Sequence, residues 1–297
     1  MSYQLELRHI HYFLAVAEDL HFRKAAERLY ISQPGLSRQI KQMEEDLGIL
    51  LFERHNRKVE LTKAGTYLKR ELSIYVKQLD DTFNHAHLLH QGKKGQLKLG
   101  YVGSAMQQII PNLLLQSKKE NPDIVFNLKE MDNQKQIDGL LNFDVDLGFV
   151  RLERVPNNIE IKPVLKDTFC LVLPKNHPID TLNFKKLSQF KDDSFILFDP
   201  EYSKSYYEKV IQIFEDAGFT PSVSHLTIHS SSIYKLVENN FGISIVPKSL
   251  TLDTKEKVKF IELDMIKQRT DLSIVWNKMN RNPILTDVLN LVKHLKI

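Results

Sequence analysis

The stretch from residue 22 to residue 47 constrains the fold of this 297-residue chain more than any other. Its first part repeats apolar residues at the i, i+3, i+4 and i+7 positions of a helix. These residues are Phe22, Ala25, Ala26 and Leu29. After a short turn, a second set follows at helical spacing: Leu36, Ile40, Met43 and Leu47. The stretch therefore predicts two short helices joined by a tight turn, the arrangement of a helix-turn-helix.

The second of these helices has clear end signals and a polar outer face. Ser32 is expected to cap its start, Pro34 fits its first turn, and Gly48 is expected to end it. The outer face carries Gln33, Ser37, Arg38, Lys41 and Gln42. Arginine can pair with guanine and glutamine with adenine in the major groove of DNA.

We therefore predict a DNA-binding helix-turn-helix from Phe22 to Lys41. Base contacts are expected from Gln33, Pro34, Ser37 and Arg38, and phosphate contacts from Lys41 and Gln42. The alternative is an ordinary helical hairpin, because polar outer faces are common in soluble proteins.

The next segment predicts a wing and a long helix. Residues 51–61 alternate weakly around a polar turn, with Arg54, Arg57 and Lys58 expected near the tip, where arginine can enter a narrow minor groove. Residues 62–65 then open a helix with an apolar seam close to heptad spacing, along which two copies could pair. The seam consists of Leu68, Leu72, Tyr75, Leu79, Phe83 and Ala86. A helix packed on its own chain is the alternative.

Beyond the polar hinge at residues 91–95, predicted strands and helices alternate. The first part is a βαβαβ unit, which implies a parallel sheet. Its strands are expected at residues 96–102, 125–131 and 146–150, and its helices at 106–119 and 134–142. The second part has strands at residues 169–173, 195–198, 223–227, 244–246 and 269–276, with helices at 204–217, 231–239 and 284–295.

Several motifs make the chain resemble the LysR-type transcriptional regulators. They are LRHIHYF at residues 7–13, SQPGLSRQI at 32–40, LFER at 51–54 and LTKAG at 61–65, in this order and with the gaps of the family. Gly35 departs from the family's usual alanine, but the first turn of a helix tolerates glycine. The resemblance covers the whole chain. It implies an all-α winged helix-turn-helix, a long linker helix that dimerises, and a two-lobed α/β domain like the type II periplasmic binding proteins.

The resemblance also implies a division of the chain. Residues 1–65 would bind DNA, residues 66–94 would form the linker helix and hinge, and residues 95–297 would bind an effector. Lobe 1 would comprise residues of about 95–165 and 268–297, and lobe 2 residues of about 166–267. The chain would cross between the lobes near residues 164–168 and 264–269.

The effector site is expected where strands end, because ligands of open α/β sheets bind beyond the carboxyl ends of the strands. Ser104 follows the first strand at a helix start that suits a carboxylate, and family effector clefts use the residue matching it. Asn133, where relatives often carry threonine, follows the second strand, and Arg151 follows the third and could pair with an anion. The second lobe offers Phe198, Tyr202, Ser203, His229 and Ser230. Capping or surface roles are the alternative for each residue, and a surface salt bridge for Arg151.

Composition narrows the class of protein further. The single cysteine, Cys170, excludes an internal disulfide and lies in a predicted buried strand. The sequence lacks an apolar run long enough to cross a membrane, a signal-peptide core, paired metal-ligand spacings and the catalytic serine elbow. We therefore expect a cytoplasmic protein with no catalytic activity, metal or cofactor.

The predicted function is sequence-specific transcriptional regulation controlled by a small anionic or carboxylate effector. The expected partners are double-stranded DNA, the effector, a second copy bound through the linker helix, further copies in a homotetramer, and RNA polymerase, but no membrane. The competing classes are a solute-binding or enzymatic α/β protein with a helical scaffold, and a repressor that needs no ligand.

Overall fold

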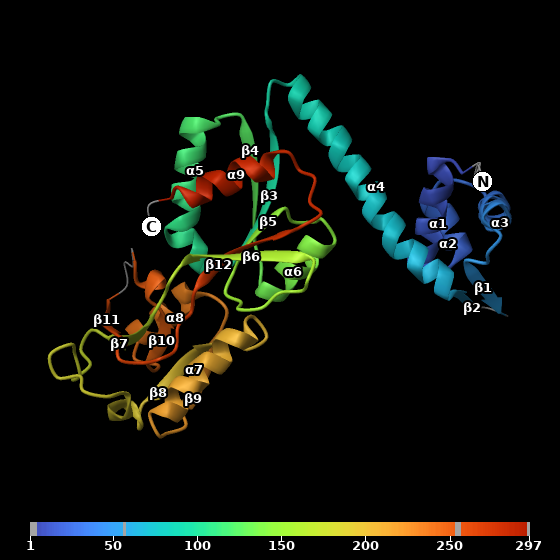
Figure 1. The fold of residues 1–297 in the computed structure, drawn as a ribbon. Helices are drawn as coiled ribbons and strands as arrows, with labels where there is room; N and C mark the ends of the chain where they lie inside the picture. Colours follow the sequence, from blue (N-terminus) through green and yellow to red (C-terminus); the bar gives the residue numbers. More distant parts are fainter. Residues whose placement is uncertain (1–4, 56–57, 253–256, 296–297) are drawn as a thin grey trace. The chain divides into compact units, whose positions relative to one another are not determined.

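The computed structural model describes residues 5–55, 58–252 and 257–295, and its helices and strands follow one another as Figure 1 shows. The chain divides into two compact units, residues 1–84 and 85–297. The division falls within the long helix α4 (Lys63–His90). Each unit is described by itself.

The first unit contains the two predicted short helices and the predicted wing. Its elements are α1 (Leu7–Asp19), α2 (Phe22–Arg28), α3 (Gln33–Leu47), β1 (Phe52–His55), β2 (Lys58–Leu61) and the first part of α4. Side chains from all three short helices and the wing form one core, in which Phe13, Ala25, Leu36 and Ile40 are fully buried. The periodicity of residues 22–47 therefore predicted the correct helices and the correct inward faces.

The ends of α3 are formed by the residues that the sequence suggested. The Ser32 hydroxyl accepts a hydrogen bond from the Gly35 amide at 3.2 Å, and Gly48 ends the helix in the left-handed region at φ 68°. A β-carbon on residue 35 would lie 2.9 Å from the Ser32 Oγ atom. Glycine at position 35 therefore leaves the capping hydroxyl its place, which gives a physical reason for the departure from alanine.

The wing is a two-stranded antiparallel sheet in which Phe52 lies opposite Leu61 and Arg54 opposite Val59. Arg57, a predicted wing contact, lies outside the described residues. The wing meets α4 at Gly65, where a β-carbon would lie 2.1 Å from the Leu51 carbonyl oxygen. Only glycine allows this close approach at the start of the long helix.

The second unit begins with a five-stranded sheet in the order β4-β3-β5-β12-β6. Its strands are β3 (Gly95–Tyr101), β4 (Ile124–Glu130), β5 (Leu147–Val150), β6 (Ile159–Leu165) and β12 (Leu272–Asn277). The three strands of the predicted βαβαβ unit are parallel, as expected, and the sheet is mixed only because two further strands join it. Strand β3 runs parallel to β4 and β5, but β12 pairs antiparallel with β5 and β6, because it returns from the second lobe.

Helices cover both faces of this sheet. The 3₁₀ helix η1 (Gly103–Gln107), α5 (Ile109–Glu120) and α9 (Ile284–Lys293) share one apolar core with it, and α6 (Asn133–Leu141) belongs to a second core. The helix predicted at residues 106–119 therefore starts later than expected, behind a separate 3₁₀ turn.

The second lobe contains two smaller sheets. One has the order β10-β7-β11, with β7 (Phe169–Pro174), β10 (Ser244–Pro247) and β11 (Val258–Glu262), and the other pairs β8 (Ser194–Phe198) with β9 (Ser222–Thr227). Its helices are α7 (Lys204–Asp216) and α8 (Ser230–Glu238), with 3₁₀ turns η2 (Leu187–Phe190) and η3 (Lys248–Thr251). Cys170 is buried in β7, as predicted, and burial raises the pKa of its thiol to about 12.

Two strands, β6 and β11, were not predicted from the sequence. Each lies at the edge of its sheet. Edge strands tolerate proline and charge, and β6 contains Pro163 while β11 contains Lys259. The chain passes from one set of sheets to the other between β6 and β7, and returns between β11 and β12, close to the expected crossings.

Candidate functional site

The outer face of α3 is open within the first unit. Gln33, Pro34 and Arg38 are exposed, and no partner in the described part of the chain engages the Arg38 guanidinium. Lys41 and Gln42 are exposed but partnered along the helix, because Lys41 lies 3.5 Å from Glu45 and Gln42 donates to Asp46 at 2.9 Å. The first turns of α3 therefore present the hydrogen-bonding groups with the fewest internal partners.

Arg54 differs from its expected position at the wing tip. It lies within β1, and its guanidinium stacks over the Phe22 ring at 4.5 Å. Its Nη1 atom donates to the Ser37 Oγ atom at 3.1 Å, so the structure brings together a predicted wing residue and a predicted base-contact residue. Lys58, in contrast, stays at the exposed wing and pairs with Glu60 at 2.5 Å.

A cavity of about 280 Å³ lies between the two lobes of the second unit. Every residue predicted for the effector lines it: Ser104, Asn133, Arg151, Phe198, Tyr202, Ser203, His229 and Ser230. Phe198 is the last residue of β8, and each of the others follows the end of a strand or opens the next helix, as expected for ligand sites of open α/β sheets. The apolar part of the lining includes Val102, Tyr206 and Leu250.

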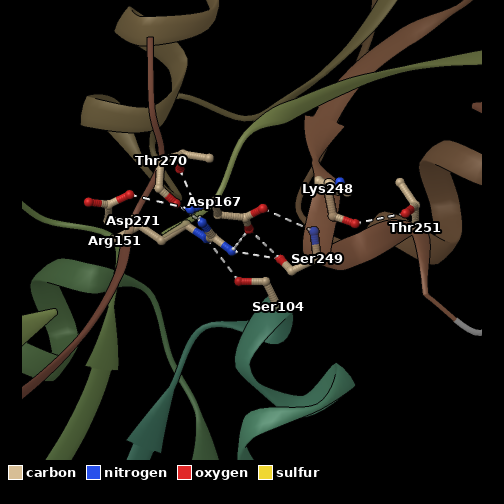
Figure 2. Close-up of polar contacts among 8 residues, drawn as sticks. All are labelled: Ser104, Arg151, Asp167, Lys248, Ser249, Thr251, Thr270 and Asp271. Carbon is tan, nitrogen blue, oxygen red and sulfur yellow. Dashed lines mark hydrogen bonds and ion pairs between the residues drawn. The ribbon is translucent and has the colours of Figure 1, made fainter. Parts of the chain in front are cut away.

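Arg151 forms the centre of a buried hydrogen-bond network beside this cavity (Figure 2). Its Nε atom donates to the Ser104 Oγ atom at 2.9 Å, and Nη2 donates to Asp167 at 2.8 Å and to Ser249 at 2.9 Å. Nη1 donates to both oxygens of Thr270. The network joins the carboxyl end of β5 to η3 and to the two segments in which the chain crosses between the lobes, where Asp167 and Thr270 lie. It therefore connects both lobes at these crossings.

The charge of Arg151 is balanced inside the network. Arg151 and Asp167 form an ion pair with side-chain exposures of 7% and 4%. Burial lowers the pKa of the Arg151 guanidinium, and the Asp167 carboxylate opposes this effect. Ser249 reinforces the pair by donating its hydroxyl to Asp167 at 2.6 Å. The guanidinium is therefore fully engaged and carries no uncompensated charge toward the cavity.

A second set of contacts supports the cavity from Asn133. Its Oδ1 atom accepts from the Arg151 amide at 3.0 Å, and its Nδ2 atom donates across the lobes to the Ser203 Oγ atom at 3.0 Å. Both Ser104 and Ser203 thus use their oxygens as acceptors. The Tyr202 hydroxyl is buried and donates no hydrogen bond in the part of the chain that the structure describes. The Gly103 amide beside it lowers its pKa, but burial outweighs this effect and raises the pKa of Tyr202 to about 12.

Sequence reasoning missed Glu130, which lines the cavity and lies 3.7 Å from the His229 Nδ1 atom. Glu130 is the last residue of β4, so the strand-end rule could have found it. It also missed Asp167, Ser249 and Thr270, for which no sequence pattern gives a signal.

The described residues include no helix that is long and apolar enough to cross a bilayer. They also contain no group of three histidine, cysteine or acidic side chains placed to hold a metal ion.

The comparisons with known proteins agree with this architecture over nearly the whole chain. Residues 7–66 match the family model of the bacterial regulatory helix-turn-helix proteins of the lysR family, and residues 90–296 match that of the LysR substrate binding domain. The chain therefore belongs to the LysR family of DNA-binding transcriptional regulators with an effector-binding domain, and it is not an enzyme.

Relatives cover the chain from end to end. The HTH-type transcriptional regulator AlsR of Bacillus subtilis (strain 168) is 31% identical over 287 residues, which cover 97% of this chain and 95% of that protein. ClcR of Pseudomonas putida is 30% identical over 288 residues, covering 97% and 98%. Full-length CbnR in complex with its target DNA is similar in structure, with a TM-score of 0.69 at 26% identity, over 97% of this chain and 99% of that chain.

Proposed function

We propose that this regulator reads DNA with the outer face of α3 and binds a small carboxylate effector in the cavity between its lobes. Residues 1–65 would bind DNA, residues 66–94 would link and dimerise, and residues 95–297 would bind the effector. One observation supports the effector site above all. Residues that lie at the ends of separate strands, more than 100 positions apart in the sequence, line the same cavity.

The hydroxyl groups of the cavity support an effector rich in hydrogen-bond acceptors. The Ser104 and Ser203 oxygens accept from Arg151 and Asn133, so their hydrogens remain available to donate. Tyr202 offers a third, buried hydroxyl, which its raised pKa keeps protonated. A buried donor without a partner costs free energy, and a carboxylate oxygen would satisfy it.

Arg151 would act on the effector through Ser104. Its N–H groups are engaged by Ser104, Asp167, Ser249 and Thr270, and its charge is balanced by Asp167. Recognition of the carboxylate would therefore depend on neutral hydroxyls, which Arg151 and Asn133 hold in place. Glu130, at the same cavity, would disfavour effectors with a second negative charge near His229.

The linker helix supports a dimer. Tyr75 and Phe83, on the predicted seam of α4, are 61% and 56% exposed, whereas Leu68 and Leu72 pack partly against the core of the first unit. The open part of the seam therefore begins at Tyr75. We propose that two copies pair along this seam, that dimers associate into a tetramer, and that the assembly acts in the cytoplasm and contacts RNA polymerase. Paired α3 helices would then enter successive major grooves about 34 Å apart.

Thermal unfolding with a panel of small carboxylates tests the effector site. A ligand at about 100 times its Kd should stabilise the wild type by about 2.7 kcal/mol, by mass action. Ser104→Leu should abolish this shift, because it fills the cavity and removes a donor, while a gel shift with the protein's own upstream region stays unchanged. Ser222→Leu, on the exposed strand β9, is the matched control and should keep the shift.

Two results would contradict the proposal. A carboxylate that stabilises Ser104→Leu as strongly as the wild type would place the effector elsewhere. A wild type that no carboxylate stabilises, but that still shifts its upstream DNA, would point to the ligand-independent repressor.

A further inference from the structure

A buried carboxylate attaches the wing to the recognition helix. Glu44, on the inner side of α3, has a side chain that is 7% exposed, and its Oε1 atom accepts from the backbone amides of Leu51 at 2.8 Å and Phe52 at 3.1 Å. These two hydrogen bonds hold the start of β1 against α3. The position of the wing strand is therefore coupled to the position of the recognition helix.

The Arg54 guanidinium occupies the space between the wing strand and α3. Its Nη2 atom lies 3.6 Å from the Glu44 carboxylate, and its Cζ atom lies over the Phe22 ring, 4.5 Å from the ring centroid. Its Nη1 atom donates to the Ser37 Oγ atom at 3.1 Å. The contacts with Phe22 and Glu44 orient the planar guanidinium of Arg54. Its hydrogen bond to Ser37 therefore fixes the position of the Ser37 oxygen.

This contact determines how Ser37 can meet a base. Accepting from Arg54 occupies one of the two lone pairs of the hydroxyl oxygen and polarises the O–H bond, so the hydroxyl becomes a weaker acceptor and a better donor for an outward contact. In the major groove guanine, adenine and thymine each present an acceptor, whereas the edge of cytosine presents only a donor. A hydroxyl held in this way favours the first three bases and disfavours cytosine on the strand that it contacts.

We propose that Arg54 is a positioning residue for sequence reading: it fixes Ser37 as a hydrogen-bond donor toward one base in the major groove. Arg54 itself contacts no base. The inference rests on the proposed DNA-reading role of α3. It means that a residue of the wing influences which base the recognition helix prefers.

Selection of bound duplexes from a randomised pool, with the full-length protein, tests this. The variants are wild type, Ser37→Ala, Arg54→Lys and the double variant. Lysine keeps a positive charge beside Glu44 but lacks the fork that reaches Ser37. Ser37→Ala should reduce discrimination against cytosine at one position by about three- to tenfold, the value of one hydrogen bond. Arg54→Lys should reduce it at the same position, and the double variant should resemble Ser37→Ala.

The control is Arg8→Lys, which makes the same exchange at the exposed pair between Arg8 in α1 and Glu6, the residue that caps this helix. It should change the base preference at no position. Arg54→Gln, which keeps a donor for Glu44, replaces Arg54→Lys if melting shows that the lysine variant folds poorly.

A uniform loss of binding on all sequences, with a weaker salt dependence, would make Arg54 a phosphate contact and overturn the proposal. Additive effects at two different positions would overturn it as well. A wild type that enriches no sequence would contradict the DNA-reading role together with this inference.

Discussion

The two units each contain an arginine that joins a serine to a carboxylate, but they differ in exposure. In the first unit Arg54, with 41% of its side chain exposed, lies 3.1 Å from Ser37 and 3.6 Å from Glu44. In the second unit Arg151, with 7% exposed, lies 2.9 Å from the Ser104 oxygen and 2.8 Å from its carboxylate partner.

The difference teaches what each cluster can do. In the first cluster water reaches the guanidinium, and Glu44 keeps two backbone amide donors, so loss of the arginine should cost little stability. In the second cluster, removal of either Arg151 or Asp167 leaves the other buried with an uncompensated charge. The pair is therefore a fixed part of the connection between the lobes. Both arginines position a serine hydroxyl, but the second contributes far more to the stability of the fold.

The largest expected effect follows from removing the buried arginine. Arg151→Met leaves the Asp167 carboxylate buried without its cation, so the free energy of unfolding should fall by about 3–5 kcal/mol. Fluorescence of the single tryptophan, Trp276, during urea unfolding reports on this unit. The matched change Arg54→Met, followed by helical circular dichroism, should cost about 1 kcal/mol. An equal loss in the free energy of unfolding for Arg151→Met and Arg54→Met would contradict the difference between the two clusters.

A smaller effect is expected at Arg38, whose guanidinium has no partner among the residues that the structure describes. Arg38→Ala should weaken DNA binding by about 1–3 kcal/mol and relax the preference at one base position, because arginine pairs bidentately with guanine. Titration of a preferred duplex and of single-site variants measures both quantities. Lys41→Ala serves as the comparison and should weaken all duplexes alike. A uniform loss from Arg38→Ala would instead make Arg38 a phosphate contact.

The smallest effect is expected at the surface beside the buried cluster. Lys248 donates to Glu262 at 2.6 Å, and this hydrogen bond is the main cause that lowers the pKa of Glu262. The pair therefore stabilises the fold above about pH 4.5, the ordinary value for glutamate, and the stabilisation is lost as the pH falls through the lowered pKa.

Both side chains are well exposed, so Lys248→Gln should cost no more than about 0.5 kcal/mol at pH 7. The difference from wild type should disappear at an acidic pH below the lowered pKa, where Glu262 is protonated in both chains. Urea unfolding at the two pH values measures this. A difference that grows on acidification would contradict the assigned cause.

The sequence predicted which residues line the cavity better than it predicted their hydrogen bonds. Ser104 and Asn133 could be placed because the strand-end rule depends only on the order of elements. The partners of Arg151 could not, because Ser249 and Thr270 lie 98 and 119 positions away and meet it only when the lobes pack.

The same limit applies to the first unit. The alternating pattern located the wing, but the Arg54 side chain turns toward α3 because Phe22 and Glu44 provide a stacking surface and a charge there. Such packing between elements leaves no periodic signal in the sequence.

The central claim is that the outer face of α3 reads base sequence in a duplex. A crystal structure of the full-length protein with a duplex obtained by selection tests it most directly. We expect α3 in the major groove, with Gln33, Ser37 and Arg38 at base edges and Arg54 still bonded to Ser37. A complex in which another surface holds the DNA, while the outer face of α3 is turned away from it, would contradict the account.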